Sequence, residues 1–252
     1  MSKNISVIVA AHKKYEMPTD PMYVPVHVGA MGKEDIGYTR DDSGDNISDK
    51  NPNFCELTGL YWAWKNLNSD YIGLAHYRRH FGRAKKVLDS VTASALLDKA
   101  DVVVPKARNY YIENLYSHYT NTLYAEPLDK TFEIIDKKHP EYSAQMQKLH
   151  KRTSAHMFNM FIMKKEHFDA YCAWLFDILF ELETIVDAKD YDSFHARFFG
   201  RISELLLDVW LNTNNIKYVE YPFIYMEKVS IVKKGTAFLM AKFFGKKYGK
   251  SF

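Results

Sequence analysis

Residues 51–81 read NPNFCELTGLYWAWKNLNSDYIGLAHYRRHF, and two kinds of apolar pattern follow each other in this stretch. The segment 55–66 predicts a helix, because its large apolar side chains recur at the spacing of one buried helical face: Leu57, Leu60, Tyr61 and Trp64. The segment 71–75 is a short apolar run that contains a glycine, which is typical of a buried strand. A helix followed by a buried strand indicates an α/β fold.

The predicted strand ends in polar residues. It delivers His76, Tyr77, Arg78 and Arg79 at its carboxyl end, and ligands of open α/β sheets bind outside the carboxyl ends of the strands. Two adjacent arginines suit a phosphate group, because each planar guanidinium can donate two parallel hydrogen bonds. The sequence therefore predicts a compact anion site, although the same residues also fit a solvated basic turn.

The rest of the chain predicts further strands and helices around this pair. The other predicted strands cover residues 5–11, 23–28, 101–105, 156–163 and 218–225, and the predicted helices cover 88–100, 128–139, 141–150, 164–183 and 202–212. The 252 residues, of which 47% are hydrophobic, can bury a large core. We therefore predict one α/β domain over residues 1–252, with a mostly parallel central sheet flanked by helices and a helical excursion at about 110–150.

Charge and cysteine content argue against several classes of protein. The net charge of +3 is too small to indicate a nucleic-acid partner. Cys55 and Cys172 each lie in an apolar helical pattern, which favours a reducing compartment over a disulfide framework or a zinc site. The apolar run near the N-terminus is too short for a signal peptide, and no run reaches the roughly 18 apolar residues of a membrane span. We therefore expect a cytosolic protein.

The segment 41–48 is a polar loop with three acidic residues: Asp41, Asp42 and Asp45. A Ca²⁺ loop needs ligands at alternating positions and a distal glutamate, and that pattern is absent. Two interpretations remain open. The loop either presents hydrogen-bonding groups to a polyhydroxylated ligand or is a plain solvated loop.

The C-terminal segment 233–252 interleaves lysines with large apolar side chains. Its lysines stand at positions 233, 234, 242, 246, 247 and 250, among phenylalanine, leucine, methionine and tyrosine. This composition is typical of an element that lies on an anionic membrane surface. A C-terminal helix packed on the domain is the alternative.

Several of these stretches together resemble one family, the short bacterial capsular and exopolysaccharide glycosyltransferases formerly catalogued as a domain of unknown function. The matching strings are VAAHK (9–13), GDNIS (44–48), CELTGLYW (55–62), GLAHYRR (73–79), HMFNMF (156–161), FGRISE (199–204) and KKGTAF (233–238). The resemblance covers nearly the whole chain and is most specific in CELT and HYRR. It implies a sugar-nucleotide-dependent transferase with a GT-A-like fold. Within the family the chain is most similar to the branch that transfers galactofuranose from UDP-galactofuranose.

The resemblance also implies roles for individual residues. The donor UDP-sugar is expected to contact Ala11, His12, Asp45, Asn46, Ser48, His76, Tyr77, Arg78 and Arg79. The acceptor or sugar pocket is expected to contain Glu56, His156, Asn159, His195 and Arg197. A direct displacement at a sugar hydroxyl needs a general base, and a carboxylate commonly fills that role. Glu204, expected at the start of a late helix, is our choice of base, with Asp45, Glu56 and Asp208 as rivals. An acidic residue at a helix start is also favoured by the helix dipole alone.

The end of the predicted strand 71–75 bears on metal dependence. GT-A enzymes usually place Asp-x-Asp at such a strand end, where it holds a divalent metal against the diphosphate. Here the strand ends in His76-Tyr77-Arg78, so that cationic side chains would stabilise the leaving UDP in place of a metal. We assign no metal ligand, although the carboxylates of loop 41–48 remain candidate oxygen ligands.

The sequence and the resemblance together predict transfer of a sugar onto a lipid-linked saccharide in capsular or exopolysaccharide synthesis, with inversion at the sugar carbon. The donor is expected to be UDP-galactofuranose, and the protein is expected in the cytoplasm at the inner face of the cell membrane. Two alternatives from other classes stay open. One is a non-catalytic nucleotide-sugar-binding subunit of a biosynthetic complex, and the other is a phosphotransferase or nucleotidyltransferase that uses the same arginine pair.

Overall fold

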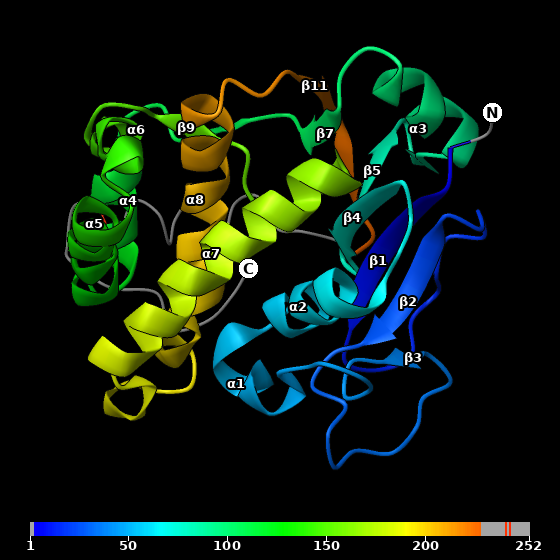
Figure 1. Cartoon of the computed structure of the whole chain (residues 1–252), viewed down its shortest axis with the longest axis horizontal. Coiled ribbons are helices and arrows are strands. Elements are labelled where there is room, and N and C mark those ends of the chain that lie inside the picture. Colours follow the sequence, from blue (N-terminus) through cyan, green and yellow to red (C-terminus); the bar gives the residue numbers. More distant parts are fainter. Residues whose placement is uncertain (1–2, 228–239, 241, 243–252) are drawn as a thin grey trace.

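A ten-stranded sheet lies at the centre of the part of the chain that this computed structural model describes, namely residues 3–227, 240 and 242 (Figure 1). One continuous path of strands has the order β11-β7-β10-β4-β1-β2-β3. Its strands are β1 (Ile5–Ala11), β2 (Tyr23–His27), β3 (Thr39–Arg40), β4 (Tyr71–His76), β7 (Val102–Pro105), β10 (Phe161–Lys164) and β11 (Tyr218–Tyr221).

Along this path every strand except β10 runs in the same direction. β1 is parallel to β2 and β4, β2 is parallel to β3, and β11 is parallel to β7, whereas β10 is antiparallel to both of its neighbours. The central strands are almost completely buried, as expected for β-branched runs covered on both faces. The predicted α/β class, with a mostly parallel central sheet flanked by helices, is confirmed.

A short hairpin extends the sheet at the carboxyl end of β4. β5 (Arg79–Arg83) folds back antiparallel to β4 directly after Tyr77 and Arg78. β6 (Lys86–Val87) and β12 (Phe223–Tyr225) both pair with β5. Arg78 therefore lies in a tight turn and Arg79 in the first position of β5, so neither arginine is part of a free loop.

The helices α2 and α7 cover one part of the sheet (Figure 1). α2 (Leu57–Asn66) packs on β1, and α7 (Lys165–Ile185) packs on β4 and β10. α8 (Phe198–Thr213) packs between α7 and the helices of the segment 115–147. The other helices are α1 (Asn51–Phe54), α3 (Ser90–Leu97), α4 (Leu115–Thr122), α5 (Glu126–Lys138) and α6 (Ser143–Gln147), with short 3₁₀ helices η1 (Ser48–Lys50), η2 (Pro140–Tyr142), η3 (Lys148–His150), η4 (Ala188–Asp190) and η5 (His195–Arg197). β8 (Arg108–Asn109) and β9 (Ser154–Ala155) form a separate pair beside this segment.

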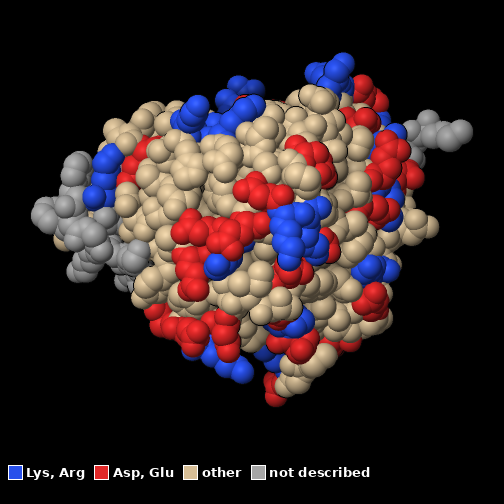
Figure 2. All heavy atoms as spheres, turned by 60° about the vertical axis from the view of Figure 1, so that its left-hand side comes forward, with Lys and Arg blue, Asp and Glu red and all other residues tan. Residues whose placement is uncertain are grey.

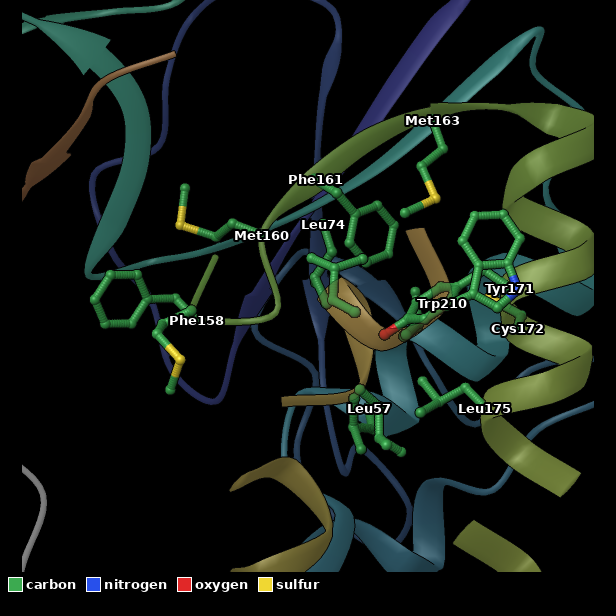
Figure 3. Close-up of a cluster of buried hydrophobic side chains, with 14 of the residues drawn as sticks. Leu57, Leu74, Phe158, Met160, Phe161, Met163, Tyr171, Cys172, Leu175 and Trp210 are labelled. Atoms are coloured by element: carbon green, nitrogen blue, oxygen red, sulfur yellow. The ribbon is translucent and has the colours of Figure 1, made fainter. Parts of the chain in front are cut away.

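The core lies where α7 and α8 meet the sheet (Figure 3). The ring of Tyr171 on α7 lies 5.5 Å from that of Phe161 on β10 and 5.5 Å from that of Trp210 on α8. The predicted buried side of α7 is confirmed at all six positions: Phe168, Tyr171, Leu175, Ile178, Leu179 and Leu182. Complete burial of one such side chain contributes about 1.5–3 kcal/mol, so this helix is a main source of the fold's stability.

The predicted helix 55–66 is interrupted at its start. α1 ends at Phe54, the backbone of Cys55 adopts φ +55°, and α2 begins at Leu57. Leu57 and Leu60 are buried as predicted, but Trp62 is buried more deeply than Trp64. The sharp link at Cys55 and Glu56 turns the chain toward the carboxyl end of β4, where both residues line a pocket shared with His76.

The predicted strand 156–163 is wrong in its first half. Phe158 and Asn159 both have positive φ angles, +79° and +54°, and β10 begins only at Phe161. An apolar run alone does not distinguish a strand from a tightly turned buried segment. The predicted strand 218–225 is divided into β11 and β12 by Pro222, whose carbonyl accepts from the N–H of Gly82.

The late helix begins four residues earlier than predicted. α8 starts at Phe198, so Gly200 lies inside the helix and not in a turn before it. Glu204 therefore lies in the second turn of α8 and does not open a helix, so the helix-dipole explanation for an acidic residue at this position does not apply.

None of the helices within the described residues is long and apolar enough to cross a membrane. The prediction for the segment 233–252 lies outside the described residues, with the exception of Met240 and Lys242.

Candidate active site

A pocket with a volume of about 160 Å³ opens at the carboxyl end of β4. It is lined by residues from the β4–β5 turn, the α1–α2 link, α4, the turn before β10 and the start of α8: Cys55, Glu56, His76, Arg78, Arg79, Arg108, Tyr110, Leu115, His118, Tyr119, Leu123, Met157, Phe158, Arg197, Gly200, Arg201, Glu204 and Leu205. The position of this pocket is where ligands of open α/β sheets bind.

The β4–β5 turn contributes two arginines with unused donors. Within the described residues, the buried Nε atoms of Arg78 and Arg79 have no hydrogen-bond partner. The guanidinium of Arg79 stacks over the ring of Phe158 at 4.3 Å, and that of Arg78 lies 5.4 Å from the ring of Tyr77. Buried cationic donors without partners are costly unless a ligand satisfies them, so the turn is suited to an anionic group.

His76, at the end of β4, lies beside the two arginines and can donate a hydrogen bond as a neutral ring. Burial holds the pKa of His76 well below its usual value, and the charges of Arg78 and Arg79 lower it further. Its Nδ1 accepts the backbone N–H of Arg78 at 3.2 Å. The proton of the neutral ring is therefore on Nε2, which can donate to a ligand oxygen. The positive charge that we predicted for this turn comes from the arginines and not from the histidine.

Three more arginines line the pocket from other elements. Arg108 lies on β8, Arg197 on η5 and Arg201 on α8. Together with the pair in the turn they give five guanidinium groups against the two carboxylates that line the pocket. This excess of positive charge matches a ligand that carries several negative charges, such as a diphosphate.

The two carboxylates are those of Glu56 and Glu204. Burial raises the pKa of Glu204; the charge of Arg201 opposes this shift, and that of Glu56 adds to it. A carboxyl group with a raised pKa inside a cleft is a candidate for proton transfer.

Glu56 is held by a hydrogen bond from Asn159. The Nδ2 of Asn159 donates to Oε1 of Glu56 at 2.8 Å and approaches the carbonyl oxygen of Gly200 at 3.0 Å. The hydroxyl of Ser203 donates to Oδ1 of Asn159 at 2.6 Å. The predicted sugar-pocket residues Glu56 and Asn159 are therefore in direct contact.

Cys55 and Arg197 meet at the base of the pocket. The Nε–H of Arg197 donates to the Sγ of Cys55 at 2.9 Å. Burial raises the pKa of the Cys55 thiol to about 11, so the sulfur is protonated at neutral pH. We therefore interpret Cys55 as a structural partner of Arg197 and not as a nucleophile.

A cluster of aromatic rings lies beside the pocket at the ends of β1 and β4. The rings of Tyr15 and Tyr77 stack at 3.8 Å, and His12 meets Tyr77 edge-on at 5.2 Å. Burial lowers the pKa of His12, and the charges of Lys13 and Arg78 lower it further. Ala11 is fully buried at the end of β1. The structure thus brings the predicted donor-binding residues 11, 12 and 76–79 to one edge of the sheet.

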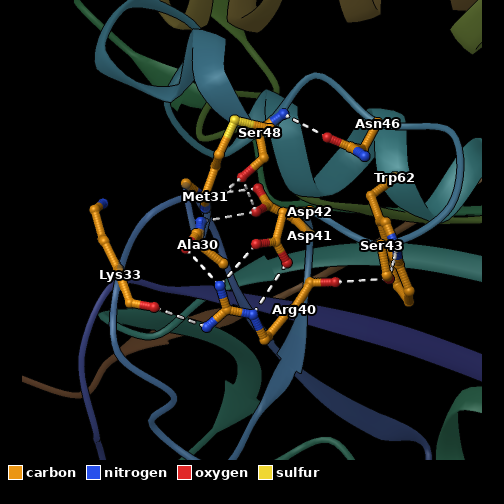
Figure 4. A network of polar contacts seen from close by, with 11 residues as sticks. Ala30, Met31, Lys33, Arg40, Asp41, Asp42, Ser43, Asn46, Ser48 and Trp62 are labelled. Carbon is orange, nitrogen blue, oxygen red and sulfur yellow. Dashed lines mark hydrogen bonds and ion pairs between the residues drawn. The ribbon is translucent and has the colours of Figure 1, made fainter.

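Of the predicted donor residues, the pocket lining includes His76, Arg78 and Arg79 and omits the others: Ala11, His12, Asp45, Asn46, Ser48 and Tyr77. Ser48 is buried and its hydroxyl donates to Asp41 at 2.5 Å (Figure 4). Asn46 accepts the N–H of Ser48, and the exposed Asp45 accepts the hydroxyl of Tyr61 at 3.2 Å.

The acidic side chains of this loop stabilise its own fold. Asp41 is completely buried and accepts the N–H groups of Gly29 and Ala30 at 2.8 and 2.9 Å. Asp42 pairs with Arg40 at 2.7 Å (Figure 4). The carboxylates that we considered as metal ligands are thus engaged with the protein.

His156 belongs to a buried ionic cluster and not to the pocket lining. Its Nδ1 lies 2.5 Å from Asp208, which also pairs with Arg152 at 2.6 Å, and its Nε2 lies 3.0 Å from Glu220. Burial lowers the pKa of His156, but the hydrogen bonds and charges of Asp208 and Glu220 outweigh burial and raise it overall. Asp208, a rival for the general base, is therefore occupied within this cluster.

His195 also lies outside the pocket lining. It opens η5, and its Nδ1 lies 2.6 Å from the carboxylate of Asp192, which precedes this helix. For a metal ion, the described residues offer one group of three neighbouring ligand side chains, Asp101, Glu166 and His167. This group is largely exposed and lies at the amino end of β7, at the opposite edge of the sheet from the pocket.

Sequence reasoning missed one wall of the pocket. This wall comes from β8 and α4: Arg108, Tyr110, Leu115, His118, Tyr119 and Leu123. The His118 ring stacks on Tyr110 at 3.9 Å and contacts Glu113 at 2.9 Å. The tyrosine-rich composition of residues 106–119 is the signal in the sequence that could have indicated this wall. Arg201 could have been inferred from its spacing of three residues from Glu204 on one helix.

The pocket lining is mostly positive, whereas the molecular surface over the helices of segment 115–147 carries charges of both signs. Figure 2 shows that face of the molecule, on which acidic side chains gather in several groups with basic side chains beside them. Lys138 on α5 and Asp177 on α7 form one ion pair of the helical part, at 2.9 Å. On the face shown both signs of charge occur together, whereas in the pocket lining the arginines outnumber the carboxylates.

The fold and the pocket define an α/β protein with a cationic ligand site at the strand ends. The chain belongs to the family described as a domain of unknown function (DUF4422), whose model matches residues 6–215. The solved structure of the bifunctional glycosyltransferase WbbM, in its apo form, is similar to this chain with a TM-score of 0.82 and 28% sequence identity. The match covers 89% of this chain and 46% of that chain, so this chain spans about half the length of its structural relative. No curated protein matches the chain.

Proposed function

We propose that this protein is a glycosyltransferase that moves a sugar from a nucleotide sugar to a saccharide acceptor. The observation that carries the proposal is that the buried Nε atoms of Arg78 and Arg79 have no hydrogen-bond partner among the described residues and lie in the same pocket as two carboxylates. Cationic donors match the diphosphate of the donor, and a carboxylate can accept the proton of a sugar hydroxyl. The similarity to a bifunctional glycosyltransferase supports the same activity, and the fold is proposed to be of the GT-A type.

In this mechanism the diphosphate lies against Arg78, Arg79 and the Nε2–H of His76. Glu204 accepts the proton of the acceptor hydroxyl. At the same time the oxygen of that hydroxyl forms a bond to the anomeric carbon of the donor sugar. The bond from that carbon to the diphosphate breaks, and the nucleoside diphosphate leaves with the electron pair. The arginines stabilise the developing charge without reorganising, because the turn already fixes them. A single displacement of this kind inverts the configuration of the sugar carbon.

The donor and the acceptor are proposed more specifically from the family resemblance. The donor is UDP-galactofuranose and the acceptor is a lipid-linked saccharide of capsular or exopolysaccharide synthesis. The acceptor's lipid keeps it at the cytoplasmic leaflet, where the lysine-rich segment 233–252 would bind anionic lipid. Sedimentation with anionic liposomes, compared between the full chain and a chain lacking residues 237–252, tests this part. Equal sedimentation of both proteins would contradict it.

The proposed activity is tested by incubating the full chain with a panel of UDP-sugars and saccharide acceptors and measuring released UDP. We expect acceptor-dependent release of UDP from at least one donor. UDP binding without release from any donor would instead identify a nucleotide-sugar-binding module. A phosphorylated or nucleotidylated product without free UDP would identify a phosphotransferase or nucleotidyltransferase.

A further inference from the structure

We infer that Asn159 is a positioning residue that holds Glu56, so that the second oxygen of the Glu56 carboxylate accepts a hydrogen bond from a sugar hydroxyl. This inference rests on the proposed function, because it assigns the substrate group that Glu56 binds. It is carried by the geometry of three segments that are distant in the sequence: the α1–α2 link, the turn before β10 and the start of α8.

The amide of Asn159 can adopt only one orientation. Its Nδ2 faces two acceptors, Oε1 of Glu56 at 2.8 Å and the carbonyl of Gly200 at 3.0 Å. Its Oδ1 faces the hydroxyl of Ser203 at 2.6 Å. A flipped amide would direct its oxygen at two other oxygens, so the amide nitrogen must point at Glu56. Asn159 is only 2% exposed, and Ser203 is completely buried, so both side chains are fixed.

The backbone on both sides of this contact is held in an unfavourable conformation. Phe158 and Asn159 have φ angles of +79° and +54°, and Cys55, directly before Glu56, has φ +55°. Asparagine tolerates this region, but phenylalanine and cysteine do so at a cost. Such conformations persist only where the surrounding structure fixes them, and they concentrate at functional sites. Here they direct the side chains of Glu56 and Asn159 toward each other.

The remaining oxygen of Glu56 is available to a ligand. Within the described part of the chain, Oε2 of Glu56 accepts no hydrogen bond, and Glu56 lines the pocket. A carboxylate accepts hydrogen bonds but repels phosphate, and Arg78 and Arg79 already provide donors for the diphosphate. Of the groups in a nucleotide sugar and a saccharide, a hydroxyl is therefore the one that fits Oε2 of Glu56.

The experiment compares Asn159→Asp, which is isosteric, with Ser203→Ala and with the wild type. Asn214→Asp is the matched control, because the Nδ2 of Asn214 also donates to a carbonyl of α8, that of Trp210, but lies at the other end of the helix. UDP affinity, kcat, the KM of donor and acceptor, and the pH dependence of kcat/KM are measured on the full chain. Thermal melts show whether each variant is folded.

We expect Asn159→Asp to lose about ten- to a hundredfold in kcat/KM, as for removal of a hydrogen bond to a charged group. UDP affinity should stay within about twofold, and Asn214→Asp should match the wild type. Because the new carboxylate repels Glu56 and Glu204, the acidic limb of the pH profile should move to higher pH. A rise in acceptor KM would place the hydroxyl on the acceptor, and a rise in donor KM at unchanged UDP affinity would place it on the donor sugar.

Wild-type-like kinetics of Asn159→Asp, or a loss of activity with an unmoved pH profile, would overturn the inference. If that variant does not fold, Ser203→Ala decides: a loss of about threefold to tenfold at unchanged UDP affinity supports positioning, and full activity overturns it. If the wild type releases no UDP from any donor, the proposed function itself fails, and the role of Asn159 fails with it. The wild-type measurement thus separates the two failures.

Discussion

Replacing Arg78 by alanine should weaken the binding of UDP to the free protein, because a fixed cationic donor in the pocket is lost. The buried Nε of Arg78 has no partner within the described residues, so the ligand-free site already bears the cost of its desolvation. An oxygen of the bound diphosphate would accept the hydrogen bond that this Nε–H can donate. The neighbouring Arg79 also stacks on Phe158, and its replacement should keep the packing, for which methionine is suitable.

The magnitude follows from the number of hydrogen bonds that each variant removes. One hydrogen bond to a charged group contributes about 1.5–3 kcal/mol, which corresponds to about 10- to 150-fold in the dissociation constant. The loss should not be complete, because Arg108, Arg197 and Arg201 remain in the pocket. Arg78→Lys should restore only part of the affinity, since an ammonium group lacks the planar fork of a guanidinium.

Isothermal titration of the full chain with UDP, at one fixed salt concentration, measures the effect. Arg83→Ala is the matched control, because Arg83 lies at the far end of β5 and is exposed. It should bind UDP within about twofold of the wild type. Wild-type affinity in both Arg78→Ala and Arg79→Met, with unchanged melting temperatures, would refute the assignment of this turn to the diphosphate.

Three further predictions concern the base, metal ions and a buried histidine. Glu204→Gln should bind UDP normally but lose about 10²- to 10⁴-fold in kcat, and activity within threefold of the wild type would transfer the role to Glu56. Turnover should continue in excess EDTA, because β4 ends in His76 and is followed by Tyr77 and Arg78 instead of paired carboxylates; loss of turnover in EDTA with recovery in Mn²⁺ would contradict this. The pKa of His156 is raised in the folded protein, so protonated His156 stabilises the fold. This contribution is complete at pH values below 6.5, the pKa of the unfolded chain, and it is lost as the pH rises through the folded-state pKa. The difference in melting temperature between the wild type and His156→Gln should therefore narrow from about pH 6 to pH 8.5, and a constant difference would count against a protonated His156.

The sheet could be predicted because its strands carry a local signal. The β-branched run of β1 and the apolar run of β4 are buried on both faces, so nearly every residue in them is apolar. The long amphipathic pattern of α7 was equally clear. In each case the residues that decide the structure are neighbours in the sequence, and no partner from elsewhere changes the interpretation.

The turn at Phe158 and Asn159 could not be predicted from the same kind of pattern. The residues HMFNMF are apolar because they are buried, and burial says nothing about the sign of φ. Only the asparagine gives a weak signal, since it tolerates the left-handed region. The conformation is fixed by contacts with Glu56 and Ser203, which are 103 and 44 residues away.

The acidic loop shows the opposite difficulty. From the sequence, Asp41 and Ser48 were polar groups of a loop, which favoured a role in contacting a ligand. In the structure both are buried and serve as acceptor and donor for the protein itself, with Thr58 donating to Asp41 at 2.6 Å. A sequence does not show whether a polar side chain points outward or closes a loop on itself, because both arrangements satisfy its hydrogen bonds.

The composition of the pocket explains why its charge is carried by arginine and not by histidine. Burial lowers the pKa of His118 and, more strongly, that of His76, so neither ring is a dependable cation at neutral pH. A guanidinium stays charged in the same surroundings, and the β4–β5 hairpin holds two of them whose buried Nε atoms have no hydrogen-bond partner in the described part of the chain. His76 then contributes a directional N–H donor instead of a charge. A leaving diphosphate would thus meet fixed positive charges and one oriented neutral donor, all in place before the bond breaks, which is the arrangement that electrostatic stabilisation of a transition state requires.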